Sequence, residues 1–232
     1  MSIKHRNFRK IEIITGIFIT LSTIAFFLSF LLSFDFSMPE GTISDDIDFL
    51  LDNPGRLKLS GTLWLITGII NMFFIPVYLL FFHRFNIVMH LINSLLLTIV
   101  AFSFYSIGLL HFDIVRFALA GPDFSIDQDT YSMEILLRAI REIKFFLQSG
   151  IASYATFATI ISSSKYKNLK FPLLTNVVNL FAGPVIVVLT LLDQANLIMT
   201  TALAAMWIGM TNIGMHLVNW GLKKDVTGEH ED

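Results

Sequence analysis

Six apolar segments, each long enough or nearly long enough to cross a lipid bilayer, constrain this 232-residue chain more than any other feature. A transmembrane helix needs about 20 apolar residues to span roughly 30 Å of hydrocarbon, and these segments come close to that length or exceed it. Only helices satisfy their own backbone hydrogen bonds in lipid. We therefore expect an all-α fold, a polytopic six-helix transmembrane bundle, with residues 1–232 forming a single integral membrane domain. The predicted spans are 11–34, 57–82, 86–110, 145–163, 171–192 and 196–222.

The composition excludes several classes of function. Hydrophobic residues make up 54% of the chain and charged residues only 15%, whereas soluble domains have about 25% charged residues. This excludes a soluble enzyme and a disordered chain. The net charge of −2 offers no basic surface for nucleic acid, and the absence of cysteine removes disulfides, thiolate nucleophiles and thiolate metal ligands.

The distribution of Lys and Arg predicts the orientation in the membrane. The connections 1–10, 83–85, 164–170 and 223–232 hold ten Lys or Arg, while the other connections, which are longer in total, hold five alongside thirteen Asp or Glu. Because Lys and Arg accumulate on the cytoplasmic side, we expect both termini in the cytoplasm of a multi-pass plasma-membrane protein. The first span is too long for a cleavable signal peptide and is expected to stay as a signal anchor.

Two predicted external segments have structure of their own. Apolar residues Ile43, Ile47, Leu50 and Leu51 alternate with aspartates at helical spacing, which predicts a short amphipathic helix on the outer surface. The charged stretch 131–147 continues without a break into the fourth span. We expect one long, continuous helix there, either standing above the membrane or bent at the interface.

The sequence contains none of the common catalytic motifs. There is no phosphate-binding G-x-x-x-x-G-K-S/T loop, no H-E-x-x-H zinc site and no G-x-S-x-G serine elbow. No lysine lies in the sixth span, so a retinal Schiff base has no attachment point. We predict no catalytic residues and no metal site, and we favour a non-enzymatic protein.

Small and polar residues recur at helical spacing within the spans. The first span carries Thr15, Ser22 and Ser29, and the sixth carries a stripe at steps of three or four residues. Such stripes are typical of helix-packing seams in membranes, and a polar cavity at the bundle centre is the alternative. The residues of the sixth-span stripe are Thr201, Ala205, Gly209, Asn212, His216 and Asn219.

Two histidines and five asparagines form the candidate ligand site. His90 and His216 lie about 6–9 Å below the cytoplasmic interface by their positions in the spans, and the asparagines lie at similar depths. Ionisable residues within a bilayer mark functional sites by default, so a polar substrate or proton path is one interpretation and simple hydrogen bonding the other. The predicted set is His90, Asn93, Asn176, Asn179, Asn212, His216 and Asn219.

The sixth span allows a sharper prediction. We expect Asn212, His216 and Asn219 to point into the bundle, because leaving amides and an imidazole unpaired in hydrocarbon is costly. Their expected partners are Asn176 and Asn179 on the fifth span, with His90 or Asn93 from the third. The opposite face carries large apolar residues and is expected to face lipid. These apolar residues include Leu203, Met210 and Leu217.

Two stretches around the second span suggest a family. Asp52-Asn53-Pro54-Gly55-Arg56-Leu57-Lys58-Leu59-Ser60 precedes this span, and Val77-Tyr78-Leu79-Leu80-Phe81-Phe82-His83-Arg84-Phe85-Asn86 closes it. Over roughly residues 9–100 the chain resembles a family of prokaryotic integral membrane proteins with six to seven helices and no known function. The resemblance implies a helical membrane fold and a location in the cell membrane.

These features favour a protein that binds or passes a small or lipidic ligand within the helix bundle, with the lipid bilayer as its surroundings. A membrane redox protein is the alternative, since imidazole is a usual axial ligand of haem b and His90 and His216 could supply two such ligands. The sequence does not indicate the oligomeric state or any protein partner.

Overall fold

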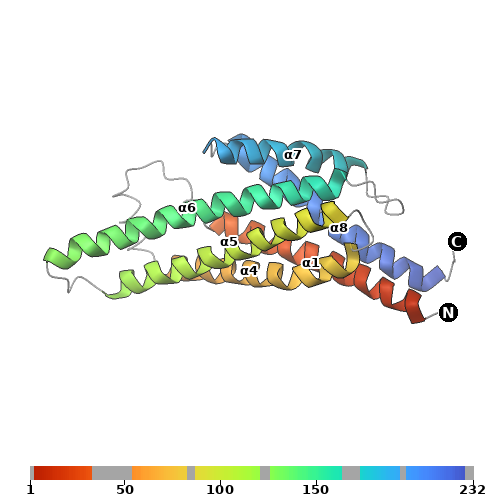
Figure 1. Ribbon diagram of the computed structural model, residues 1–232, viewed down its shortest axis with the longest axis horizontal. Coiled ribbons are helices and arrows are strands. Elements are labelled where there is room, and N and C mark those ends of the chain that lie inside the picture. The colour runs from red at the N-terminus through yellow and green to blue at the C-terminus, as the bar shows by residue number, and fades with distance from the viewer. Residues whose placement is uncertain are drawn as a thin grey trace.

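The computed structural model consists of six helices and describes residues 3–32, 54–82, 87–120, 126–163, 173–193 and 197–227 (Figure 1). No strand occurs within these ranges, so the predicted all-α, six-helix fold is confirmed. The expected amphipathic helix around residues 43–52 lies outside the described residues. The helices are α1 (Ile3–Leu32), α4 (Pro54–Phe82), α5 (Ile87–Ala120), α6 (Ile126–Ser163), α7 (Leu173–Leu191) and α8 (Leu197–Thr227).

Five of the helices are long and apolar enough to cross a membrane: α1, α4, α5, α6 and α8. The predicted fifth span corresponds to α7, which is apolar but has only 19 residues. At 1.5 Å per residue α7 is about 28 Å long, close to the roughly 30 Å of bilayer hydrocarbon. This arrangement is compatible with a multi-pass membrane protein.

The helices pack in chain order around a closed ring. Each packs against the next, and α8 packs against α1 to close the ring. Helix α6 also touches α8, which leaves α7 at the edge of the bundle, resting on these two helices (Figure 1). The N- and C-termini lie at the same end of the bundle, as an even number of antiparallel helices requires.

Aromatic rings fill the middle of the bundle. The ring of Phe26 on α1 lies 5.1 Å from that of Phe104 on α5 and 5.2 Å from that of Tyr154 on α6, measured between centroids. Trp64 on α4 lies 4.9 Å from Phe104. All four side chains are buried. The centre of the bundle is therefore a packed aromatic core, and the polar stripes lie along the seams between neighbouring helices.

Glycines let the backbones approach at these seams. A Cβ atom on Gly214 of α8 would lie 2.7 Å from the carbonyl oxygen of Gly16 on α1. On α7, a Cβ atom on Gly183 would overlap the hydroxyl of Thr159 on α6. Close backbone packing of this kind is the usual way in which helices associate within a membrane.

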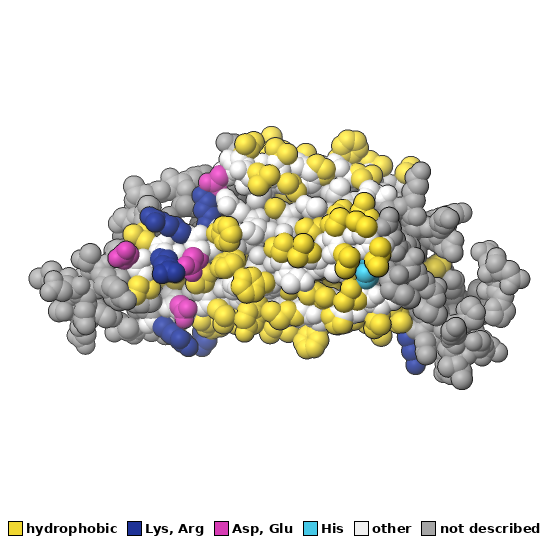
Figure 2. Space-filling view, viewed as in Figure 1, with side chains coloured by type: hydrophobic (Ala, Val, Ile, Leu, Met, Phe, Trp, Pro, Cys, Tyr) yellow, Lys and Arg dark blue, Asp and Glu magenta, His cyan; other side chains and the backbone are white. Residues whose placement is uncertain are grey.

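The surface divides into an apolar belt and a charged end. Figure 2 shows large apolar side chains along the middle of the bundle and charged side chains gathered at one end. Side chains of the belt include Phe102 and Phe181, which are 58% and 72% exposed. An outward apolar surface of this extent is what a helical protein presents to lipid. The charged end is the one opposite the termini and includes Arg116, Arg138 and Arg141.

The charged end is built by extensions of α5 and α6. Helix α6 has 38 residues and runs unbroken from the charged stretch into the fourth span, which confirms the expected long, continuous helix. Helix α5 also extends beyond the predicted third span, which ends at residue 110, and continues to Ala120. The reason is packing outside the predicted span: Ile114 of α5 is fully buried and belongs to the same apolar cluster as Leu136 and Ile143 of α6.

Candidate functional site

The seven predicted site residues do not form one cluster. His90 and Asn93 of α5 face α4, where Asn93 Nδ2 donates a hydrogen bond of 2.9 Å to Tyr78 Oη. The ring of His90 stacks on that of Tyr78 with centroids 5.4 Å apart. The expected pairing of these residues with the sixth span is therefore wrong. The cause is the order of the ring, in which α5 packs along α4 and α6 while α8 packs along α1 and α7.

The predicted orientation of α8 was wrong for Asn219 and for the apolar face. Asn219 is exposed, and Asn212 and His216 are half-buried. The apolar face that was expected to contact lipid is buried instead, with Leu203 and Leu217 only 3% and 0% exposed. Helix α8 turns this face inward because its close approach to α1 runs through Gly214, which lies on the same side of the helix as Leu217 and Met210.

A second group of polar residues lies where α6, α7 and α8 meet. Asn179 of α7 is fully buried, and its Nδ2 donates a hydrogen bond of 3.0 Å to Ser162 Oγ of α6. On its other side, the Asn179 amide occupies the space that a Cβ atom on Gly209 of α8 would need. Asn179 therefore lies against Gly209 of the sixth-span stripe, while its hydrogen bond goes to α6 and not to the expected Asn212, His216 or Asn219.

The antiparallel register extends this contact toward the end of the bundle that carries the termini. Consecutive helices α7 and α8 pack together, with Asn179 level with Gly209. Asn176 and Asn212 each lie three residues further toward the same end, so they come to about the same depth along the pair. We call the region around Ser162, Asn176, Asn179, Gly209 and Asn212 the α7 seam.

Buried polar atoms without a hydrogen-bond partner concentrate on α7 and α8. Within the described residues they include three oxygens of α7 and two atoms of α8. Leaving such an atom unpaired costs about 1–3 kcal/mol, so the two amide oxygens of the seam, on Asn176 and Asn179, make its closed form costly. Asn93 Oδ1 on α5 is a further atom of this kind. The atoms on α7 and α8 are Asn176 Oδ1, Asn179 Oδ1, Thr190 Oγ1, Trp207 Nε1 and Thr211 Oγ1.

The polar residues between α1 and α4 are, by contrast, hydrogen-bonded. Ser22 Oγ donates to Asn71 Oδ1 at 2.8 Å, and the hydroxyls of Ser29 and Thr67 are 3.0 Å apart. Asn71 Nδ2 in turn donates to the Thr67 carbonyl. The sequence stripe indicated Ser22 and Ser29 but not Asn71, although the four-residue spacing of Thr67 and Asn71 was a signal available in the second span. The polar groups of this network are engaged with one another, so its role is to hold the two helices together.

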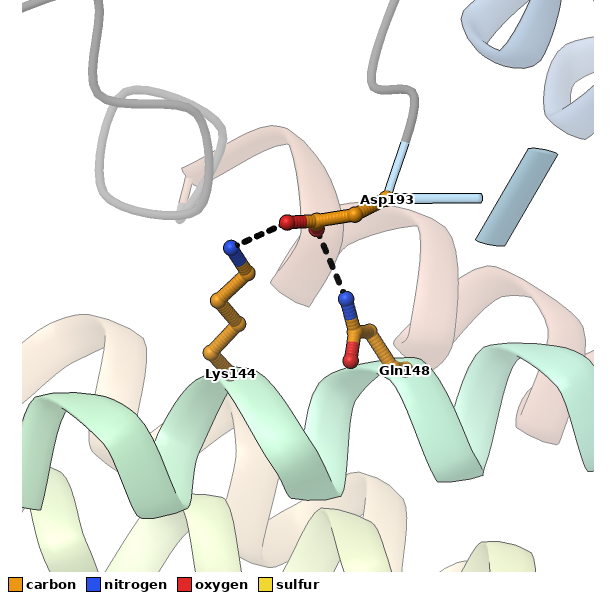
Figure 3. Close-up of polar contacts among 3 residues, drawn as sticks. All are labelled: Lys144, Gln148 and Asp193. Atoms are coloured by element: carbon orange, nitrogen blue, oxygen red, sulfur yellow. Dashed lines mark hydrogen bonds and ion pairs between the residues drawn. The ribbon is translucent and has the colours of Figure 1, made fainter. Parts of the chain in front are cut away.

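At the charged end, one carboxylate connects the α7–α8 turn to α6. Asp193 accepts hydrogen bonds from Lys144 Nζ at 2.6 Å and from Gln148 Nε2 at 2.8 Å (Figure 3). Asp193 has a φ of 53°, a left-handed conformation that aspartate adopts more readily than most residues. We call this set of two hydrogen bonds the Asp193 latch. It fixes one end of α7 and lies at the end opposite the termini, away from the amides of the seam.

Among the described residues no group of three or more His, Asp or Glu side chains could hold a metal ion. His90 lies on α5, which packs against α4 and α6, whereas His216 lies on α8, which packs against α7 and α1. Haem ligation by these two residues stays a prediction from the sequence, and the absorption spectrum of the purified protein tests it.

No protein-family model matches the sequence, and no curated protein or solved structure matches it either.

Proposed function

We propose that this chain is an integral plasma-membrane protein that binds a small or lipidic ligand in the α7 seam. The observation that carries the proposal is a pair of buried amide oxygens in this seam, Asn176 Oδ1 and Asn179 Oδ1, which have no hydrogen-bond partner in the described structure. Buried polar groups are nearly always paired in native proteins. A ligand that supplies hydrogen-bond partners for these atoms recovers the free energy that is lost when they stay unpaired in the closed seam.

The ligand enters from the side of the bundle and not along its axis. Phe26, Trp64, Phe104 and Tyr154 pack the axis. Helix α7, in contrast, lies at the edge of the bundle and rests on α6 and α8 (Figure 1). Because Asn179 is fully buried, a ligand reaches its amide only when α7 moves away from these two helices. The proposal therefore includes an opening movement of α7.

The proposed orientation places both termini in the cytoplasm, on the basis of the Lys and Arg distribution. The two termini share one end of the bundle, which supports this topology (Figure 1). Since the chain has no cysteine, single-cysteine variants report the topology directly. A membrane-impermeant maleimide added to intact cells should label Arg116→Cys and Arg138→Cys and leave Lys10→Cys unlabelled. Labelling of Lys10→Cys from outside would contradict the orientation.

Native mass spectrometry of the purified protein tests binding. The wild-type protein should retain a bound ligand through detergent exchange, and Asn179→Leu, which removes the buried amide, should lose it. Asn219→Leu is the matched control, because Asn219 is an exposed amide of α8 outside the seam. Equal retention of ligand by Asn179→Leu and the wild-type protein would contradict the proposal.

A further inference from the structure

The unpaired atoms of the α7 seam specify what a ligand has to supply. Asn176 Oδ1 and Asn179 Oδ1 are carbonyl oxygens, which only accept hydrogen bonds. A ligand that pairs with these atoms needs a hydrogen-bond donor for the two amide oxygens. A free hydroxyl group provides such a donor without adding a charge.

The seam is also electrically neutral. No Asp, Glu, Lys or Arg occurs in residues 145–163, 173–191 or 197–222, which are the parts of α6, α7 and α8 that surround it. An ionised headgroup would therefore be buried without a counter-charge. Phosphate-bearing lipids are disfavoured on this ground.

Helix α7 has polar residues near its first residue and mostly apolar residues along the rest of its length. Asn176 and Asn179 lie three and six residues from its first residue, or about 4–9 Å along the axis. The outward side chains that follow are apolar, including Phe181, Val185 and Val188. A lipid whose polar group reaches the amides can lay its acyl chains along this apolar surface.

We infer that the ligand of the α7 seam is an uncharged lipid with a free hydroxyl group, of the diacylglycerol class. This inference rests on the proposed function and specifies its ligand. The free hydroxyl donates to Asn176 Oδ1 or Asn179 Oδ1. A phosphatidylcholine headgroup has no donor for the two amide oxygens, so the bulk phospholipid does not compete well for the seam.

Three lipids with the same acyl chains test the inference. Wild-type protein in phosphatidylcholine nanodiscs is titrated with diacylglycerol, with triacylglycerol, which lacks the hydroxyl, and with phosphatidic acid, which adds a charge. Binding is measured by native mass spectrometry. Diacylglycerol should bind at least about ten-fold more tightly than either analogue, a difference of about 1.4 kcal/mol. Equal or tighter binding of either analogue would overturn the inference.

Variants of the seam asparagines distinguish a wrong ligand class from a wrong binding site. Asn176→Leu and Asn179→Leu should each weaken diacylglycerol binding about ten-fold or more, and Asn219→Leu should not. Asn176 is only half-buried, so Asn176→Leu keeps the test decisive if Asn179→Leu does not fold. If phosphatidic acid binds and the asparagine variants weaken that binding, the proposed site stands and the inferred ligand class is wrong. If neither variant changes the binding of any of the three lipids, both proposals are wrong.

Discussion

The hydroxyl of Tyr154 on α6 lies 2.6 Å from Oγ1 of Thr23 on α1. Thr23 Oγ1 already donates to the Ile19 carbonyl at 2.7 Å, so Tyr154 is the donor in the contact between the two side chains. Helices α1 and α6 are not neighbours in the ring. This hydrogen bond therefore connects opposite parts of the bundle through the aromatic core.

Removing this bond should destabilise the bundle modestly. Tyr154→Phe keeps the ring and deletes the hydroxyl, so we expect the free energy of unfolding to fall by about 1 kcal/mol, as for other interhelical hydrogen bonds in membranes. Tyr154→Ala should cost about 3–5 kcal/mol because it leaves a cavity among the aromatic rings. Denaturant unfolding in mixed micelles measures both values. Tyr105→Phe, at a half-buried tyrosine, is the control, and a loss equal to that of Tyr154→Phe would contradict the account.

The contact between α1 and α8 should tolerate no added methyl group. Gly214→Ala places a Cβ atom 2.7 Å from the Gly16 carbonyl oxygen, so the helices must separate. We expect a loss of about 1–3 kcal/mol in the free energy of unfolding, the usual cost of overpacking. Gly55→Ala is the matched control, since its Cβ atom meets nothing within 4 Å and alanine favours a helix by up to about 1 kcal/mol. Equal melting temperatures of the two variants would argue against this packing.

The sequence predicted the helices well because hydropathy and length depend only on local composition. It predicted the facing of α8 poorly, for a physical reason. Lipid is as apolar as the protein interior, so a large apolar residue gains little by turning outward, and backbone approach decides which face is buried. Helix α8 has two such faces, one through Gly209 toward Asn179 and one through Gly214 toward Gly16. A single polar stripe could indicate only the first.

The candidate site was predictable in part. The asparagines of the fifth span stood out because amides are rare in apolar segments, and Asn179 does lie against the Gly209 stripe. The separation of His90 and Asn93 from this region depends on the order of the helices around the ring. That order is a property of the whole bundle, and the residues of any one span do not encode it.

The Asp193 latch should contribute to stability through the backbone conformation of Asp193 more than through its charge. The pair of Lys144 and Asp193 is more than half exposed, so Lys144→Met should cost less than about 1 kcal/mol. Asp193→Ala should cost about 1–2 kcal/mol, because alanine adopts the left-handed conformation less readily and loses both hydrogen bonds. Asp193→Asn should lose less, since asparagine tolerates that conformation. Thermal melts of the three variants measure the differences, and a larger loss for Lys144→Met than for Asp193→Ala would contradict this interpretation.

Opening of α7 is the central claim, and a reversible lock tests it most directly. In Thr159→Cys/Gly183→Cys, the Cβ atoms would lie 3.2 Å apart across α6 and α7, close to the spacing of about 3.8 Å in disulfides. Ser103→Cys/Gly150→Cys has the same 3.2 Å separation across α5 and α6 and is the matched control. No native cysteine interferes.

Diacylglycerol binding by each double variant is measured after oxidation and again after reduction, with disulfide formation verified by mass. Oxidation should abolish binding when it joins α6 to α7, reduction should restore it, and the control should bind in both states. Undiminished binding by the oxidised α6–α7 variant would show that the ligand does not need α7 to move, and would contradict the account.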